Sequence, residues 1–182
     1  HGSLAAMSKA FLDKFSHYRQ QIDTLRNQNK AYDDAKTFAD DIKAAKQALK
    51  DAEDTILRNI ESMINSQMTR YNDFVYNQTR KAPEINLFDG TRYEFTTPDD
   101  TGTGTSYKSL IVFDLSILKL TQLPTLIHDS LIFNDIGYAP LEKIMELYTQ
   151  SSKQIFIAFD KKEAPTKAIQ KILDSASILH LS

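Results

Sequence analysis

The sequence predicts an α/β protein in which part of a mostly parallel sheet, with a β-hairpin, follows a long helical hairpin or coiled-coil arm. Residues 4–82 contain neither glycine nor proline, and apolar side chains recur there at steps of three and four, the spacing of packed helices. After Pro83, short apolar runs alternate with amphipathic segments, which is typical of parallel strands joined by helices. Asp89-Gly90 lies between two short strand-like runs, as in a tight hairpin. We therefore divide the chain into residues 1–3, a cloning remnant, residues 4–82, the helical arm, and residues 83–182, the α/β domain.

The helical half contains two apolar series. They comprise Leu4, Met7, Phe11, Phe15, Tyr18, Ile22 and Leu25, and then Phe38, Ile42, Ala45, Leu49, Ala52, Ile56, Ile60 and Met63. Between them, residues 27–30 are polar and poor in helix formers. We predict helices over about 4–27 and 31–80 that pack antiparallel after a turn, with one continuous rod as the alternative. Because the seam exceeds what one small lobe can cover, self-association is also expected.

The second half predicts these elements in order. They are a hairpin of 85–88 and 92–95 whose turn uses the positive φ of Gly90, a loop over 97–105, a helix over 106–121 capped by Ser106, a buried strand over 124–130, a helix over 139–151, a buried strand over 154–159, a helix over 163–173 and a last strand over 178–181.

Composition excludes several classes of protein. The chain has no cysteine, so disulfides, cysteine-ligated metals and thiol nucleophiles are impossible, and a reducing, cytoplasmic location is expected. The net charge of −2 indicates neither nucleic acid nor an anionic membrane surface as a partner. The longest dense apolar run, residues 110–118, is too short to cross a bilayer, so no membrane association is expected.

A glycine- and threonine-rich run precedes the helix predicted at 106. It comprises Gly102, Thr103, Gly104, Thr105 and Ser106, followed by Lys108. Glycines let a backbone approach an anion closely, hydroxyl groups donate hydrogen bonds, and a helix N-terminus offers free N–H groups. The run is therefore a candidate phosphate site. The alternative is a flexible loop before a capped helix.

The stretch His128-Asp129-Ser130 ends the strand predicted over 124–130. Neighbouring residues on a strand point to opposite faces, so these three cannot form a Ser–His–Asp relay among themselves. An acidic residue at the carboxyl end of a parallel strand can hold Mg²⁺ beside a ligand, which makes Asp129 a candidate metal ligand. The alternative is a polar strand end satisfied by the loop backbone.

These motifs together resemble the C-terminal lobe of the ABC-type ATPase heads of the SMC and RecN group. More closely, residues 100–104, 107–110, 113–115, 123–124, 127–130 and 154–156 are similar to the domain of unknown function at the C-terminus of bacterial YydD-type, SMC-like coiled-coil ATPases. The resemblance implies a partial ABC-ATPase-like lobe preceded by the root of a coiled-coil arm.

Carried over residue by residue, the resemblance implies a set of site residues. Gly102, Thr103, Gly104, Thr105, Ser106 and Lys108 would take the signature position that binds nucleotide, and Asp129 would be the Walker B aspartate near Mg²⁺. His128, Asp129 and Ser130 would form the catalytic stretch, with residues 134–135 near the D-loop. ATP and Mg²⁺ are the cofactors implied for the full-length protein, and none is expected in this chain alone.

The sequence departs from the family pattern at four points, which include a replaced Leu-Ser-Gly-Gly signature and a missing switch histidine near residues 159–160. No GxxxxGK[ST] motif occurs, so the triphosphate would be held by a separate N-terminal Walker A lobe. Ser130 replaces the usual glutamate and cannot act as a general base at neutral pH. The leading hypothesis is half of an ATPase head that is inactive alone, with DNA as a partner through the full-length protein. The alternatives are a non-enzymatic dimerisation scaffold and a small hydrolase that uses His128 and Asp129 with a metal.

Overall fold

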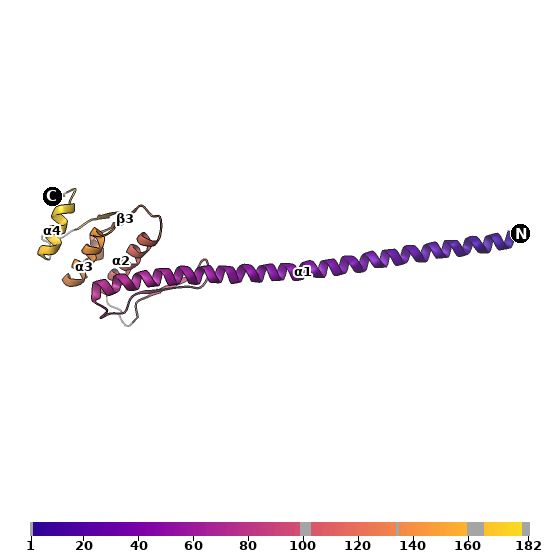
Figure 1. Ribbon diagram of the computed structural model, residues 1–182, viewed down its shortest axis with the longest axis horizontal. Helices are drawn as coiled ribbons and strands as arrows, with labels where there is room; N and C mark the ends of the chain where they lie inside the picture. Colours follow the sequence, from indigo (N-terminus) through magenta and orange to yellow (C-terminus); the bar gives the residue numbers. More distant parts are fainter. Residues whose placement is uncertain (1, 99–102, 134, 160–165, 180–182) are drawn as a thin grey trace. The chain divides into compact units, whose positions relative to one another are not determined.

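The computed structural model describes residues 2–98, 103–133, 135–159 and 166–179 (Figure 1). The elements are α1 (Gly2–Tyr76), β1 (Glu84–Leu87), β2 (Tyr93–Thr96), α2 (Thr103–Leu120), β3 (Thr125–His128), the 3₁₀-helix η1 (Ser130–Phe133), α3 (Tyr138–Thr149), β4 (Gln154–Ile157) and α4 (Lys167–Ala176). The chain divides into two units, residues 1–53 and 54–182.

Helix α1 is continuous, so the predicted turn at 27–30 is wrong and the alternative of one rod is confirmed. The polar residues there cost only about 0.5 kcal/mol each in helix propensity, and no glycine or proline interrupts the backbone. The helix ends where Asn77 and Gln78 take left-handed φ angles of 50° and 63°. The carbonyl of Tyr76 then accepts from the backbone N–H of Thr79 at 3.0 Å.

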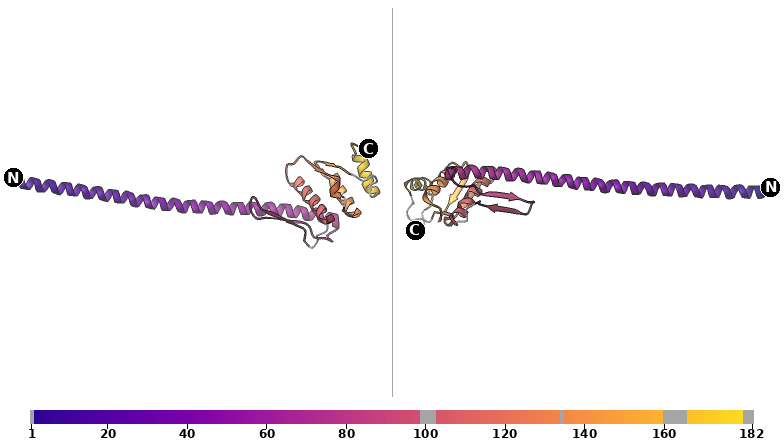
Figure 2. Two further views of the ribbon diagram at one scale, coloured as in Figure 1. Left: turned by 180° about the vertical axis from the view of Figure 1, so that it is seen from behind. Right: turned by 90° about the horizontal axis from the view of Figure 1, so that it is seen from below.

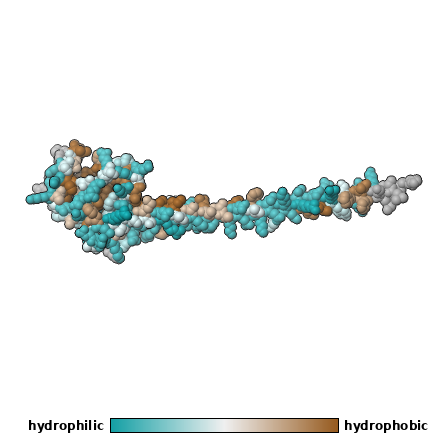
Figure 3. Space-filling view, viewed as in Figure 1, coloured by the Kyte–Doolittle hydropathy of each residue, from teal (hydrophilic) through white to brown (hydrophobic). Residues whose placement is uncertain are grey.

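In the first unit, residues 2–53 form a single helical segment, and the apolar side chains of residues 9–53 are exposed. Phe11, Phe15, Ile42 and Leu49 are 68%, 57%, 56% and 61% exposed, so the predicted antiparallel packing within the chain is wrong. Figure 3 shows apolar residues separated by hydrophilic ones along α1. Without the turn, no second helix in the described residues covers these side chains.

The end of α1 binds the edge of β1 through side chains. The Asn65 amide donates to the Ile85 carbonyl and accepts from the Ile85 N–H, both at 2.9 Å. One helical turn earlier, the Glu61 carboxylate accepts from the Leu87 N–H at 2.7 Å. Four residues of a helix and two residues of a strand each advance about 6–7 Å. The side chains of Glu61 and Asn65 on α1 are therefore spaced like the backbone groups of Leu87 and Ile85 on β1, which runs antiparallel to the helix. These bonds satisfy the edge of β1 that β2 leaves open.

We expect replacement of Asn65 by alanine to lower the free energy of unfolding by about 1–3 kcal/mol, because both Ile85 backbone groups lose their partner. The measurement is urea unfolding followed by the near-ultraviolet circular dichroism of the tyrosines. The matched control is Asn59→Ala, at an exposed position of the same helix. Equal effects of the two substitutions would contradict the role of the Asn65 amide.

The predicted hairpin is confirmed: β1 and β2 pair antiparallel from Glu84↔Thr96 to Leu87↔Tyr93, as the right-hand view of Figure 2 shows. The predicted reason for its turn is wrong, because no described glycine has a positive φ. Asp89 organises the turn instead. Its Oδ1 accepts from the N–H and hydroxyl groups of Thr91 at 2.8 and 2.7 Å, and its Oδ2 accepts from Arg92 Nε at 2.7 Å. The Thr91 hydroxyl, followed by Arg92, holds the pKa of Asp89 well below its usual range.

Strands β3 and β4 pair in parallel from Thr125↔Gln154 to His128↔Ile157, with α3 between them in sequence, as predicted. Both strands are shorter than predicted, and they are not buried on both faces: Ile127 is 72% exposed and Phe156 is 38% exposed. Helix α4 begins at Lys167, later than predicted, and its cap is Thr166, whose hydroxyl accepts from the Ile169 N–H at 3.2 Å. Residues 177–179 form no strand, and the rest of the predicted last strand lies outside the described residues.

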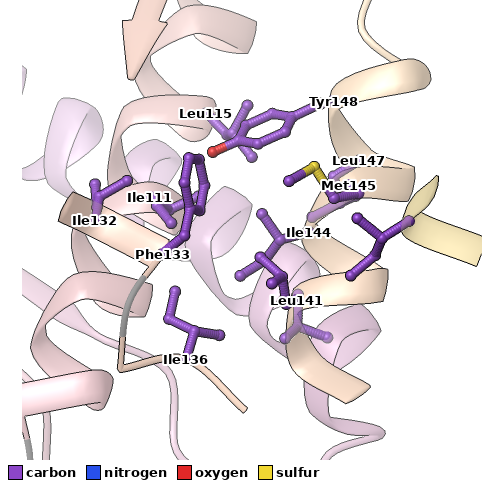
Figure 4. Packing of buried hydrophobic residues seen from close by; sticks show 12 residues of the cluster. Ile111, Leu115, Ile132, Phe133, Ile136, Leu141, Ile144, Met145, Leu147 and Tyr148 are labelled. Carbon is purple, nitrogen blue, oxygen red and sulfur yellow. The ribbon is translucent and has the colours of Figure 1, made fainter. Parts of the chain in front are cut away.

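The main core lies between α2, η1 and α3 (Figure 4). Its buried residues are Val75, Ile111, Leu115, Ile132, Phe133, Ile136, Leu141, Ile144, Met145, Leu147, Tyr148 and Ile169. A second cluster of Met68, Ile85 and Val112 joins α1, β1 and α2. The end of α2 is capped by Lys153, whose ammonium group donates to the carbonyls of Leu118, at 2.6 Å, and Thr121. This core positions the carboxyl end of β3.

Candidate functional site at the carboxyl end of β3

The predicted nucleotide-binding run is mostly helix. Gly102 lies outside the described residues, while Thr103, Gly104 and Thr105 form the first turn of α2. Ser106 therefore lies within the helix, and its predicted role as the N-cap is wrong. Binding of phosphate by these residues stays a prediction.

Lys108 is fully buried and points at α1. Its Nζ donates to Asn72 Oδ1 at 3.2 Å and lies 4.9 Å from the centre of the Tyr76 ring. The Asn72 amide in turn donates to the Arg80 carbonyl at 2.8 Å. A buried ammonium group requires such partners because its desolvation is costly. Lys108 thus fastens α2 to the end of α1, and the geometry gives no support to its predicted contact with a nucleotide.

His128 is 4% exposed and lies at the centre of a polar network. Its Nδ1 is 2.7 Å from the Tyr148 hydroxyl on α3, and its Nε2 is 3.0 Å from Asp114 Oδ2 on α2. Because the Tyr148 hydroxyl is the donor to Nδ1, we infer that the ring proton lies on Nε2, which donates to Asp114. Both ring nitrogens are engaged, which leaves His128 as a structural link rather than an open base. The hydrolase hypothesis therefore gains nothing from the geometry.

Asp114 and Tyr148 were not predicted as site residues. Asp114 interrupts the apolar run of residues 110–118, and this charged residue among apolar ones is the feature of the sequence that could have indicated its role. In the sequence, Tyr148 occupies one of the apolar positions of the amphipathic helix predicted over 139–151, and nothing marks its hydroxyl group. Burial, and then the nearby charge of Asp114, raise the pKa of Tyr148 above its ordinary value, so its phenol stays protonated as a donor.

Tyr148→Phe should have two effects on stability. At neutral pH it leaves His128 Nδ1 buried without a partner, which costs about 1–3 kcal/mol. In the wild type, the raised pKa of Tyr148 means that stability is complete below the unfolded tyrosine value of about 10 and falls as the pH rises above it. The variant should lose most of that alkaline fall, with a smaller part remaining from Tyr71, whose pKa is raised by burial.

The measurement is urea unfolding at a series of pH values from neutral to alkaline. Tyr93→Phe removes a hydroxyl at a position that is 69% exposed, and should leave both the neutral stability and the alkaline fall unchanged. An unchanged alkaline fall in Tyr148→Phe would contradict the protonated network.

Asp129 is exposed directly after β3. Its Oδ1 accepts from the Ser130 N–H at 2.6 Å and the Ser130 hydroxyl at 3.2 Å, and its carbonyl accepts from the Ile132 N–H at 3.3 Å. Asp129 and Ser130 thus begin η1 and turn the chain away from the strand. Within the described part of the chain, Oδ2 of Asp129 forms no hydrogen bond or ion pair, and it remains available to a ligand.

Within the described residues, no group of three or more histidine, aspartate or glutamate side chains gathers to hold a metal ion. A single carboxylate still fits Mg²⁺, which usually keeps water and phosphate oxygens as its other ligands. Asp129 suits that role, whereas His128 is committed to its own partners. Of the predicted D-loop pair, Asp135 is exposed and Asn134 lies outside the described residues.

The profile of DUF2326, a family described as uncharacterised and conserved in bacteria, matches residues 71–182. The chain belongs to this family. The match spans the end of α1 and every later element, including His128, Asp129 and the network around them. The predicted YydD-type relationship is finer than this match and stays a prediction.

Among solved structures, the family member is similar to a protein from work on the ATP-driven dimerisation and DNA-stimulated activation of SMC ATPases. The identity is 12%, the TM-score is 0.48, and the alignment covers 67% of this chain and 78% of that one. A comparison with curated proteins finds no match. In the described residues, no helix is both long and apolar enough to cross a membrane.

Proposed function

We propose that this chain is the C-terminal half of an SMC/RecN-like, ABC-type ATPase head and is inactive alone. The observation that carries the proposal is the incomplete parallel sheet. Parallel sheets occur almost only with both faces covered, whereas β3 and β4 form a two-stranded sheet with apolar side chains exposed on one face. Ile127 and Phe156 are register partners on that face. Such an exposed apolar face suits a partial sheet that another lobe extends and covers.

The position of Asp129 supports the same proposal. Ligands of open α/β sheets bind outside the carboxyl ends of the strands, where Asp129 is exposed. In the assembled head, Asp129 would hold Mg²⁺ as a Walker B aspartate, and residues 102–106 would act as a signature-like loop toward ATP on a partner head. The metal would supply charge stabilisation during phosphoryl transfer.

The N-terminal lobe with a Walker A motif is the first partner that the proposal requires. Self-association of two heads is the second, since a signature loop acts on nucleotide bound to the other copy. DNA is a further proposed partner of the complete protein, and the proposed location is the cytoplasm.

The test compares this chain alone with a protein that joins it to its N-terminal lobe, using phosphate release and calorimetry with ATP. The chain alone should neither hydrolyse ATP nor bind it at micromolar concentration, because nothing in its sequence encloses three phosphates. The two-lobe protein should do both. Micromolar binding by the chain alone, or no turnover by the two-lobe protein, would contradict the proposal.

A non-enzymatic dimerisation scaffold is the second candidate, and the exposed apolar residues of α1 favour it. A strip of large apolar side chains along a helix is a surface that a second helix normally covers. Under this alternative, sedimentation equilibrium shows self-association of the chain, and the two-lobe protein has no ATPase activity. Self-association together with ATPase activity supports the first candidate.

A further inference from the structure

A pocket of about 470 Å³ lies between α1, α2, the end of α3 and the chain that follows α3, and Asp129 is not among the residues that line it. One face of α1 contributes Gln67, Arg70, Tyr71 and Phe74, whose spacing of three and four residues places them side by side on the helix. The volume falls within the usual range for sites that bind small molecules. The pocket lies wholly within the unit of residues 54–182.

The floor of the pocket is apolar and its rim is cationic. Leu115 and Leu147 belong to the main core and Leu118 is a further buried residue of α2, while Arg70, Lys119 and Lys153 bring three positive charges. None of the described lining residues is acidic. The Lys153 ammonium group is held in place by the carbonyls at the end of α2.

The two remaining cations have no such commitment. Arg70 and Lys119 are exposed, and within the described part of the chain neither forms an ion pair. Two exposed cations above a leucine floor are the arrangement that recognises a molecule with one anionic end and one apolar end. Gln67, Gln150 and Ser152 add neutral hydrogen-bonding groups around the same opening.

We propose that this pocket binds a small organic anion, in which a phosphate or carboxylate group is attached to an apolar ring or chain. The anion lies between Arg70 and Lys119, and the apolar part lies on Leu115, Leu118 and Leu147. The proposal does not depend on the ATPase proposal, because none of these residues belongs to the site at β3.

The test uses 1-naphthyl phosphate as the probe and the 182-residue chain as the protein. Because the chain has no tryptophan, the fluorescence anisotropy of the naphthyl group can be followed with little protein background. Saturable binding is expected. Comparison with 1-naphthoate shows whether the pocket prefers a phosphate or a carboxylate. 1-Naphthol lacks the anionic group and inorganic phosphate lacks the apolar ring, so each should bind at least about tenfold more weakly than 1-naphthyl phosphate.

Arg70→Gln and Lys119→Gln should each weaken binding of 1-naphthyl phosphate about tenfold, since each removes a charged hydrogen bond from an exposed position that the fold does not need. The matched control is Arg58→Gln, which makes the same change at an exposed position of α1 outside the pocket. It should leave binding unchanged.

Three results would overturn the proposal: no saturable binding of either anionic probe, equal affinities for 1-naphthol and 1-naphthyl phosphate, or equal weakening by Arg58→Gln and Arg70→Gln. Asp129→Asn should not affect binding of the probe, so failure of this proposal and failure of the ATPase proposal are separately visible.

Discussion

Phe133→Ala should remove most of the stability of the unit of residues 54–182. Phe133 is 1% exposed at the end of η1, and its ring centre lies 5.8 Å from that of Phe159, 6.3 Å from that of Tyr148 and 6.5 Å from that of His128. Truncating a buried phenylalanine typically costs about 3–5 kcal/mol through lost burial and the cavity left behind. The total stability of a small domain is about 5–15 kcal/mol, so this is a large part of it.

The measurement is urea unfolding followed by near-ultraviolet circular dichroism, because the far-ultraviolet signal is dominated by the 75-residue helix α1 and reports poorly on the core. Leu131→Ala is the matched control. Leu131 lies in the same 3₁₀-helix but is 63% exposed, so its truncation should change the free energy of unfolding by about 0.5 kcal/mol or less. Similar losses in the two variants would contradict the packing described for η1.

Asp129→Asn should reduce Mg²⁺-dependent ATP hydrolysis by the two-lobe protein about a hundredfold or more. Under the proposed function, Asp129 is a ligand of the ion that stabilises charge developing on the phosphates, and an amide is a poor substitute for a carboxylate there. The fold should persist, because the amide oxygen can still accept the bonds from Ser130. Phosphate release at saturating Mg²⁺ and ATP measures the effect.

The control for this experiment is Asp174→Asn. It makes the same change at an exposed position of α4, where the amide oxygen can still accept from Gln170. Hydrolysis at the wild-type rate by the Asp129→Asn protein would show that Asp129 is only the first residue of the turn into η1. A Gly104→Asp variant gives a second test, because negative charge at a helix start that approaches phosphate should prevent head association.

Elements with strong local signals were predictable. The alternation of strand, helix and strand over β3, α3 and β4 gave parallel pairing, and the two short runs around Asp89 gave the hairpin. The turn of that hairpin was assigned to Gly90 because Asp-Gly is a common pair in tight turns. In the structure, the Asp89 carboxylate stabilises the turn instead. The loop is longer than a two-residue turn, so the Asp89 side chain can accept hydrogen bonds from the N–H groups of Thr91 and Arg92.

The candidate site was predictable only in part. The position of Asp129 at the end of a strand follows from the local pattern. The hydrogen bonds of His128 could not be predicted in this way, because Asp114 lies 14 residues before it and Tyr148 lies 20 residues after it, on two other elements. The burial of Lys108 could not be predicted for the same reason. Its sequence neighbours suggest an exposed helix start, and only the contact of α2 with Asn72 and Tyr76 makes it a buried residue.

The amino-acid sequence by itself determined local matters: the helical character of residues 4–76, the order of the later elements, and the lack of a Walker A motif and of cysteine chemistry. These depend on the period of apolar residues and on residue types, which act over a few positions. Tertiary structure decided which groups are buried, and that Asn65 and Glu61 pair with a strand. Such outcomes depend on packing between distant segments, where a difference of about 1 kcal/mol in local propensity is outweighed by burial.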